Sequence, residues 1–166
     1  MTKRIVIQQG FHAVSIEAVA REAGITRPIV YGHFTDLPGL LEALVDREGA
    51  RALGQLEGVL PQPDLLEALR AYLQAVSDDP DTWRLVLMPQ EGAPRLLHER
   101  IAAGRAAVIA RLALALEPGE NLPDPELSAH MLSAYADEAA RLVLQDYDVE
   151  RILELTRWAL ARLASR

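Results

Sequence analysis

Between Thr26 and His33 the chain holds a short series of side chains that can form hydrogen bonds with nucleic acid. The guanidinium of Arg27 can donate two hydrogen bonds to a guanine base. The hydroxyls of Thr26 and Tyr31 and the imidazole of His33 can donate to phosphate oxygens. Ile29 offers only an apolar surface, of the kind that contacts a thymine methyl group. Such contacts require a helix that carries these side chains into a groove of DNA.

The residues around this segment predict a helix-turn-helix. Ser15 can cap a first helix, and the apolar residues after it recur at the i, i+3, i+4 spacing of one helix face. Gly24 can adopt the left-handed conformation that ends that helix. Thr26 can cap a second helix with Pro28 in its first turn, where the missing N–H does no harm. This geometry places the second helix in the major groove.

The same segment, residues 10–34, resembles the DNA-binding domain of the TetR/AcrR family of transcriptional regulators. The resemblance rests on the GF pair at residues 10–11, on AGIT at residues 23–26 and above all on YGHF at residues 31–34, which matches the family's Y-x-H-F motif. It covers roughly residues 5–48. Beyond that stretch, only an all-helical layout of about the right size agrees with the family.

The resemblance implies an all-α protein with two parts. A helix-turn-helix DNA-binding domain with a short first helix is expected over residues 1–48, and a helical ligand-binding and dimerisation domain over residues 49–166. The implied function is that of a ligand-responsive transcriptional regulator. We expect a repressor that binds a near-palindromic double-stranded DNA operator as a homodimer, without a cofactor, and is released by a small-molecule effector.

Carried over position by position, the resemblance also assigns DNA contacts. Arg27 is the best candidate for a base contact, and Val30 and Phe34 should face the core. The residues implied to contact DNA are Thr26, Arg27, Pro28, Ile29, Tyr31, Gly32 and His33.

Composition sets outer limits on the protein. Its 166 residues suit one compact unit or two small ones that share a core, and half of them are hydrophobic. The absence of cysteine excludes disulfides and thiolate metal sites. No apolar run approaches the roughly 18–20 residues of a membrane span, and no secretory leader begins the sequence. We therefore expect a soluble cytoplasmic protein.

The net charge of −7 is unevenly distributed along the chain. The first 35 residues carry four basic and two acidic side chains, whereas the remaining residues carry 13 basic and 22 acidic ones. This asymmetry favours a nucleic-acid-binding face at the N-terminus. The positive excess is small, so tight DNA binding would require a dimer and local contacts.

Helical periodicity dominates the whole sequence, and strand signals are nearly absent. Aspartates 36, 64, 79 and 148 stand where they can cap helices. Prolines 61 and 63 break the chain, and residues 117–125 are expected to form a loop. The expected helices span residues 2–9, 15–22, 26–33, 36–58, from 64 onward, 79–88, 94–116, 125–147 and 149–165.

The last two expected helices carry apolar stripes. One stripe consists of Leu132, Tyr135, Ala136, Ala139, Leu142 and Val143, and the other of Val149, Ile152, Thr156, Ala159, Leu160 and Leu163. Two antiparallel helices with such faces can pair with their copies in a four-helix bundle. The resemblance implies the same mode of dimerisation. Alternatively, both stripes face the core of their own chain, and each helix can serve both roles.

Bulky and amphipathic residues of the second half are candidates for a ligand cavity. They stand on helices that surround the ligand in TetR-like folds: Tyr72, Trp83, Met88, Gly104, Arg105, Met131 and Tyr135. Gly104 would leave room or permit a close backbone approach, and Arg105 or Tyr135 would orient an apolar or amphipathic ligand. For each residue the alternative is plain core packing.

Motifs of the common enzyme classes are absent from the sequence. It lacks G-x-S-x-G, G-x-x-x-x-G-K-[ST], G-x-G-x-x-G and H-E-x-x-H. His98 and His130 have no partner at metal-ligand spacing, so no metal site is expected. Three aspartates at positions 78, 79 and 81 are explained by the favourable field at a helix N-terminus. We therefore expect a regulator and not an enzyme.

Two rival interpretations stay open. In one, a TetR-like dimer that binds a small molecule or a protein has lost DNA binding. The short first helix and Leu37, which stands where the family usually has Lys, favour this rival, whereas the intact segment 26–34 opposes it. In the other, a helical enzyme uses the same cavity, but it would need an acid–base pair that no motif supplies.

Overall fold

The computed structural model describes residues 1–57, 59, 64–89, 92–116 and 124–164. This part of the chain forms nine α-helices and one short 3₁₀ turn, without a strand, which confirms the expected all-α class. The predicted break at residues 61–63 and most of the predicted loop, residues 117–123, lie outside the described residues. The elements are α1 (Thr2–Gln9), η1 (Phe11–Ala13), α2 (Ile16–Ala23), α3 (Arg27–His33), α4 (Leu37–Leu56), α5 (Leu65–Asp78), α6 (Pro80–Leu87), α7 (Arg95–Leu116), α8 (Pro125–Val143) and α9 (Val149–Ala164).

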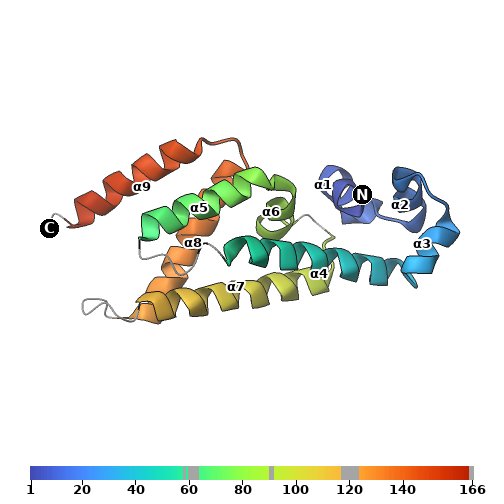
Figure 1. Cartoon of the computed structure of the whole chain (residues 1–166), viewed down its shortest axis with the longest axis horizontal. Coiled ribbons are helices and arrows are strands. Elements are labelled where there is room, and N and C mark those ends of the chain that lie inside the picture. Colours follow the sequence, from blue (N-terminus) through green and yellow to red (C-terminus); the bar gives the residue numbers. More distant parts are fainter. Residues whose placement is uncertain (58, 60–63, 90–91, 117–123, 165–166) are drawn as a thin grey trace.

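The molecule is elongated, with α1 to α3 at one end and α9 at the other (Figure 1). The long helices α4 and α7 run side by side along most of its length. Helices α5 and α6 pack against α4, α8 packs against α7, and α9 packs on α5. None of the described helices combines the length and the apolarity that a membrane span requires.

The helix-turn-helix forms through the local signals that the sequence contains. The side chain of Ser15 accepts a hydrogen bond from the Ala18 N–H at 3.0 Å and so caps α2. Gly24 ends α2 in the left-handed region, with φ 65° and ψ 28°. Helix α3 begins after Thr26 with Pro28 in its first turn, but the Thr26 hydroxyl makes no capping hydrogen bond. Its hydroxyl is therefore available for other partners.

Two larger hydrophobic clusters share α4. The first cluster gathers α1, α2 and α3 around Leu40, Leu44 and Val45 of α4. The second begins at Ala52 and contains the inner faces of α5, α6, α8 and α9, with Leu73 at its centre. Because one continuous helix supplies both clusters, movement of α4 would affect both ends of the molecule. The predicted domain boundary at residue 48 falls between them and stays a prediction.

Two local differences from the predicted helices have clear causes. Helix α8 ends at Val143 instead of Tyr147, because Asp146 adopts a left-handed conformation with φ 68°. The N–H groups of Asp146 and Tyr147 then bond the carbonyls of Val143 and Leu142, which is the Schellman pattern. The 3₁₀ turn η1 was not predicted, since three residues carry no periodic signal.

Several residues of the apolar stripes predicted for α8 and α9 are buried in the core of their own chain. Ala139, Ile152 and Thr156 are buried, and the first two belong to the second cluster of their own chain. The side chain of Leu163 lies outside the described residues. Large apolar side chains that remain exposed on these two helices are Leu127, Met131, Tyr135, Leu155, Trp158 and Leu160.

Candidate nucleic-acid interface and ligand cavity

Helix α3 presents an exposed surface at the end of the molecule. Val30 is only 2% exposed and Phe34 is half-buried, and both pack into the first cluster, as predicted. The opposite face of α3 and its first turn are open to solvent. All seven residues predicted to contact DNA are exposed: Thr26, Arg27, Pro28, Ile29, Tyr31, Gly32 and His33.

Arg27 already has a partner within the domain. Its Nη1 lies 2.8 Å from Oε1 of Glu17 on α2, and both side chains are more than half exposed. Arg4 of α1 pairs in the same way with Glu22 of α2. Exposed ion pairs contribute only about 0–1 kcal/mol, so either arginine can be drawn away by a phosphate or a base. Glu17 was not predicted as the partner of Arg27, because charge patterns along a chain do not reveal which helices will meet.

Leu37 has a packing role at the start of α4. It is half-buried against the first cluster, while the neighbouring Asp36 side chain accepts the Gly39 N–H at 2.8 Å. Leucine therefore contributes here to the packing of α4 against the helix-turn-helix.

A cavity of about 460 Å³ lies between α4, α5, α6, α7 and α8, with α9 at one side. Its wall is predominantly apolar. Six of the seven residues predicted to surround a ligand line it: Tyr72, Trp83, Gly104, Arg105, Met131 and Tyr135. Met88 does not line it. Helix α6 ends at Leu87, and Met88 follows as a 40% exposed residue outside the cavity.

Gly104 widens the cavity in the middle of α7. A Cβ atom at this position would meet only Cδ2 of Leu53, at 3.8 Å, which is an ordinary contact. No close backbone approach requires glycine here. Of the two explanations that the sequence left open, the geometry favours added room.

Arg105 and Asp137 form the charged part of the cavity wall. Nη2 of Arg105 on α7 lies 2.6 Å from Oδ2 of Asp137 on α8. The hydroxyl of Tyr72 donates to Oδ1 of Asp137 at 3.3 Å. Burial raises the pKa of Asp137 above its usual range, although Arg105, Arg141 and Tyr72 act in the opposite direction. The charge of Arg105, which was expected to orient a ligand, is thus already balanced by Asp137.

Asp137 was missed by the sequence analysis, although a signal was present. It stands between Ala136 and Ala139 on the inner side of α8, where an isolated carboxylate would be costly. Another polar contact of the cavity wall joins the hydroxyls of Tyr135 and Thr156, whose oxygens are 2.6 Å apart. The Thr156 hydroxyl also donates to the Ile152 carbonyl at 2.8 Å.

A largely buried ion pair joins the N-terminal helix α1 to α4. Nζ of Lys3 lies 2.9 Å from Oε2 of Glu48, a residue of α4 that is only 3% exposed. The fully buried Thr82 of α6 accepts from Lys3 at 3.0 Å and donates to Glu48 at 2.8 Å. Burial acts to raise the pKa of Glu48, but hydrogen bonds from Lys3, Thr82 and Arg47 outweigh it and lower that pKa.

Asp79 extends this network toward the cavity. Instead of capping α6, its carboxylate accepts hydrogen bonds from Arg51 and, at 2.9 Å, from Gln55. Gln55 in turn accepts from Nε1 of Trp83 at 2.7 Å, and Lys3 lies 3.6 Å from Asp79. Burial opposes ionisation, yet these partners hold the pKa of Asp79 at about 2.

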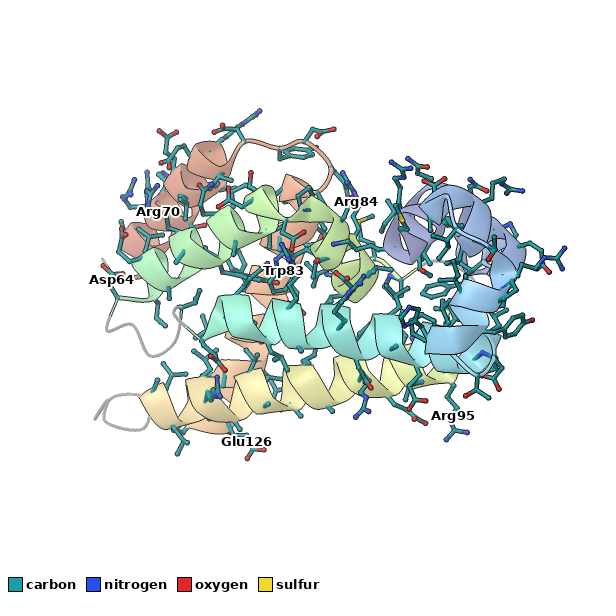
Figure 2. All side chains as sticks on the ribbon, turned by 45° about the vertical axis from the view of Figure 1, so that its right-hand side comes forward. Asp64, Arg70, Trp83, Arg84, Arg95 and Glu126 are labelled. Atoms are coloured by element: carbon teal, nitrogen blue, oxygen red, sulfur yellow. The ribbon has the colours of Figure 1, made fainter. Side chains whose placement is uncertain are left out.

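The network therefore runs without interruption from the cavity wall to α1. Trp83 lies beside the cavity, in the middle of the part of the molecule formed by α5 to α9 (Figure 2). The ring of Tyr72 packs edge-on against it, with 5.1 Å between the ring centroids. Glu48 had a sequence signal, since it follows Leu44 and precedes Ala52 at helical spacing on the buried face of α4. Thr82 and Asp79 had none, because their partners come from distant helices.

The described residues contain no group of three or more His, Cys, Asp or Glu side chains that could hold a metal ion. His98 and His130 are exposed.

Comparisons with known proteins agree with this geometry. Residues 2–44 match the family model of bacterial regulatory proteins, tetR family. A TetR-like transcriptional regulator from Rhodococcus sp. RHA1 is similar over 99% of this chain and 92% of its own, with a TM-score of 0.79 and 24% identity. The transcriptional regulator FadR from Bacillus subtilis, solved with stearoyl-CoA, is similar over 93% and 92%, with a TM-score of 0.68 and 18% identity.

The fatty acid degradation regulator FadR from Bacillus halodurans is similar over 93% of this chain and 92% of its own, with a TM-score of 0.66 and 17% identity. Residues 2–44 thus match the tetR-family model, and the chain as a whole has the same fold as a solved TetR-like transcriptional regulator.

Proposed function

We propose that this protein is a ligand-responsive repressor, which binds a DNA operator as a homodimer and leaves it when a small apolar or amphipathic molecule enters the cavity. One observation carries the proposal: a single helix, α4, connects an exposed helix-turn-helix to a predominantly apolar cavity. Leu40 and Leu44 fix its first half in the N-terminal cluster, while Ala52 and Leu53 line the cavity.

The exposed face of α3 supplies the DNA contacts in this proposal. Arg27 reads a base, and the polar side chains of Thr26, Tyr31 and His33 hold phosphates, because phosphate contacts position a protein and base contacts specify the sequence. The remaining candidates, Pro28, Ile29 and Gly32, allow α3 to approach the groove closely. Support comes from the exposure of all seven and from the weak pairing of Arg27 with Glu17.

The buried network supplies the connection between effector and DNA. An effector in contact with Trp83 alters the position of Gln55 and Asp79, and through Lys3 and Glu48 the relation of α1 to α4. A ligand shifts this equilibrium only by its differential affinity for the two states. By linkage, DNA must then weaken effector binding by the same factor.

The chemistry of the cavity supports an apolar effector. Most binding sites combine an apolar wall with a few orienting polar groups, and here the orienting groups are Arg105, Asp137 and the hydroxyls of Tyr72 and Tyr135. The B. subtilis FadR with stearoyl-CoA has the same fold at 18% identity. That relative supports a mainly hydrocarbon effector for this chain as well.

The exposed apolar residues of α8 and α9 support a homodimer. Leu127 and Met131 on α8 and Leu155 and Trp158 on α9 are each more than half exposed. Exposed large apolar side chains on α8 and α9 are candidates for an interaction site, and two helices from each chain can form a four-helix bundle about a two-fold axis.

Selection of DNA fragments from a random pool by the purified protein tests the function. We expect a near-palindromic sequence to be enriched, and its affinity to fall steeply with salt as counterions are released. Absence of any preference at low salt would overturn the repressor proposal. It would favour the rival function, in which the same dimer binds only a small molecule or a protein. The packing role of Leu37 is consistent with that rival.

A further inference from the structure

We propose that the effector is an uncharged molecule whose single polar group is a hydroxyl, which bridges Arg105 and Asp137 in an otherwise apolar cavity. This inference rests on the proposed function, because it concerns the cavity in which the effector is placed.

The charges of the cavity wall are already balanced within the chain. Arg105 pairs with Asp137, and Arg100 pairs with Asp46 at 2.9 Å. Glu48 is held by Lys3, Thr82 and Arg47. Among the described residues, every buried polar side-chain atom has a hydrogen-bond partner. A charged ligand would therefore enter an apolar space that offers it no unpaired counter-charge, and this costs free energy.

The pair still has hydrogen-bonding capacity for a neutral group. The Asp137 carboxylate accepts from Arg105 and Tyr72, and a carboxylate has about four lone-pair positions. The Arg105 guanidinium has five N–H donors in total, and its side chain is partly open. A hydroxyl can donate to Asp137 and accept from Arg105 at the same time, so it satisfies both partners without separating them.

Charged groups lack this advantage. A ligand carboxylate beside Arg105 would face the like charge of Asp137, and a ligand ammonium beside Asp137 would face Arg105. Either one would have to break an ion pair in a partly buried site, which leaves one charge uncompensated. The side chains of Asp137 and Tyr72 are largely shielded from water, and burial raises the pKa of both groups.

The rest of the wall suits a hydrocarbon body. Apart from the Arg105–Asp137 pair, the wall includes the aliphatic side chains of Leu53, Leu56, Leu69, Ile101, Val108 and Leu112. A saturated chain or ring system fits such a surface, and the burial of each methylene group favours binding.

Titration calorimetry with three ligands of equal chain length tests the inference. 1-Decanol, decanoate and decylammonium are titrated into the full-length protein below their micelle concentrations. We expect 1-decanol to bind at least about tenfold more tightly than either ion, the factor that one or two lost polar contacts produce. The three ligands share the same hydrocarbon, so the comparison isolates the polar group.

Variants of Arg105 and Asp137 should change the order of affinity of the three ligands in opposite directions. Asp137→Asn leaves the charge of Arg105 unbalanced, so decanoate should gain at least about tenfold relative to 1-decanol. Arg105→Gln should favour decylammonium in the same way. Glu138→Gln and Arg95→Gln are matched controls, since both residues are exposed and lie outside the cavity wall. Arg95 lies at the N-terminal end of α7 (Figure 2).

The outcomes separate this inference from the function on which it rests. If decanoate or decylammonium binds as tightly as 1-decanol, the hydroxyl assignment is overturned, although the cavity remains an effector site. If none of the three binds, the assignment is overturned as well. The DNA selection described above judges the repressor proposal independently of either result. A variant that loses its helical circular dichroism is replaced by the other variant of the pair.

Discussion

At the scale of single residues, Arg27 determines whether α3 can read a sequence. Its exposed pair with Glu17 costs little to break, so the guanidinium is available to a guanine. Arg27→Ala should weaken binding to the selected operator by about 1–3 kcal/mol and relax the preference at one base pair. Fluorescence anisotropy with the operator and its single-base variants measures both effects.

Two further variants serve as controls for this prediction. Tyr31→Phe should weaken binding to all DNA sequences alike, since a phosphate contact carries no sequence information. Glu17→Gln removes the competitor of Arg27 and should leave operator affinity equal or higher. An Arg27→Ala variant that loses the same affinity for every sequence would assign Arg27 to the phosphate backbone instead.

Thr82 is a second residue with a measurable role. It is fully buried and joins Lys3 to Glu48. Thr82→Val keeps the shape but leaves both charged groups short of a partner, so it should lower the free energy of unfolding by about 1–3 kcal/mol. Thr82→Ser keeps the hydroxyl and loses one methyl group, worth about 0.8 kcal/mol. Urea unfolding should give a lower free energy of unfolding for Thr82→Val than for Thr82→Ser. The reverse order would show that the hydrogen bonds of Thr82 do not stabilise the fold.

Asp79 makes the stability of the fold depend on pH. Its folded-state pKa, about 2, lies below its ordinary value of 3.8. Ionised Asp79 therefore stabilises the fold above the ordinary value, and this contribution disappears as the pH falls toward 2. Asp79→Asn should show a shallower loss of unfolding free energy than the wild type over that interval. Urea unfolding at a series of pH values gives the two curves, and parallel curves would contradict the prediction.

Residue roles could be predicted from the sequence where they depend on near neighbours. The Ser15 cap and the left-handed Gly24 are such cases, because a cap or a turn involves residues only three or four apart. Asp79 was predicted to cap α6 with its side chain, but its carboxylate instead interacts with Arg51, Gln55 and Lys3. Partners of this kind are set by helix packing, which a single sequence does not specify.

At the scale of elements, α7 determines how much room the cavity has. Gly104→Leu should fill the space beside Leu53. We expect binding of the neutral dye Nile red to weaken at least about tenfold, while operator affinity without effector stays unchanged. Dye fluorescence and operator anisotropy measure the two properties on the same protein.

Gly104→Ala is the control for the same position. A Cβ atom here meets only an ordinary contact at 3.8 Å, and alanine favours a helix over glycine by about 1 kcal/mol. This variant should be more stable than the wild type and should still bind the dye. If Gly104→Leu binds Nile red as the wild type does, the effector site lies elsewhere in the protein.

Helices were predictable because 3.6-residue periodicity and aspartate caps recur through the chain. The predicted starts at Asp36, Asp64 and Asp148 agree with capping hydrogen bonds in the structure. Which side of a helix faces inward was harder to predict. Helices α8 and α9 are apolar on more than one side, so the stripe chosen from the sequence contains buried Ala139 and Ile152.

At the scale of the whole molecule, assembly depends on the sides of α8 and α9 that their own core leaves uncovered. Ala139 is 4% exposed and packs within the second cluster, so a charge at that position would act on folding and not on assembly. Trp158 on α9 is 58% exposed, with Leu155 beside it at 62%. These two residues replace Ala139 as the positions at which the dimer can be tested.

Trp158→Glu should convert the dimer into a folded monomer, because it puts a charged carboxylate in place of an apolar indole that the interface would bury. Sedimentation velocity at micromolar concentration should show half the wild-type mass, with helical circular dichroism unchanged. Operator affinity should fall sharply, since each monomer then holds one half-site of a pair spaced about 34–36 Å apart, and each N-terminal domain has little positive charge. Ala139→Glu should instead lower the unfolding free energy of the chain. A wild-type monomer, or a Trp158→Glu protein that remains dimeric, would place the interface on another surface.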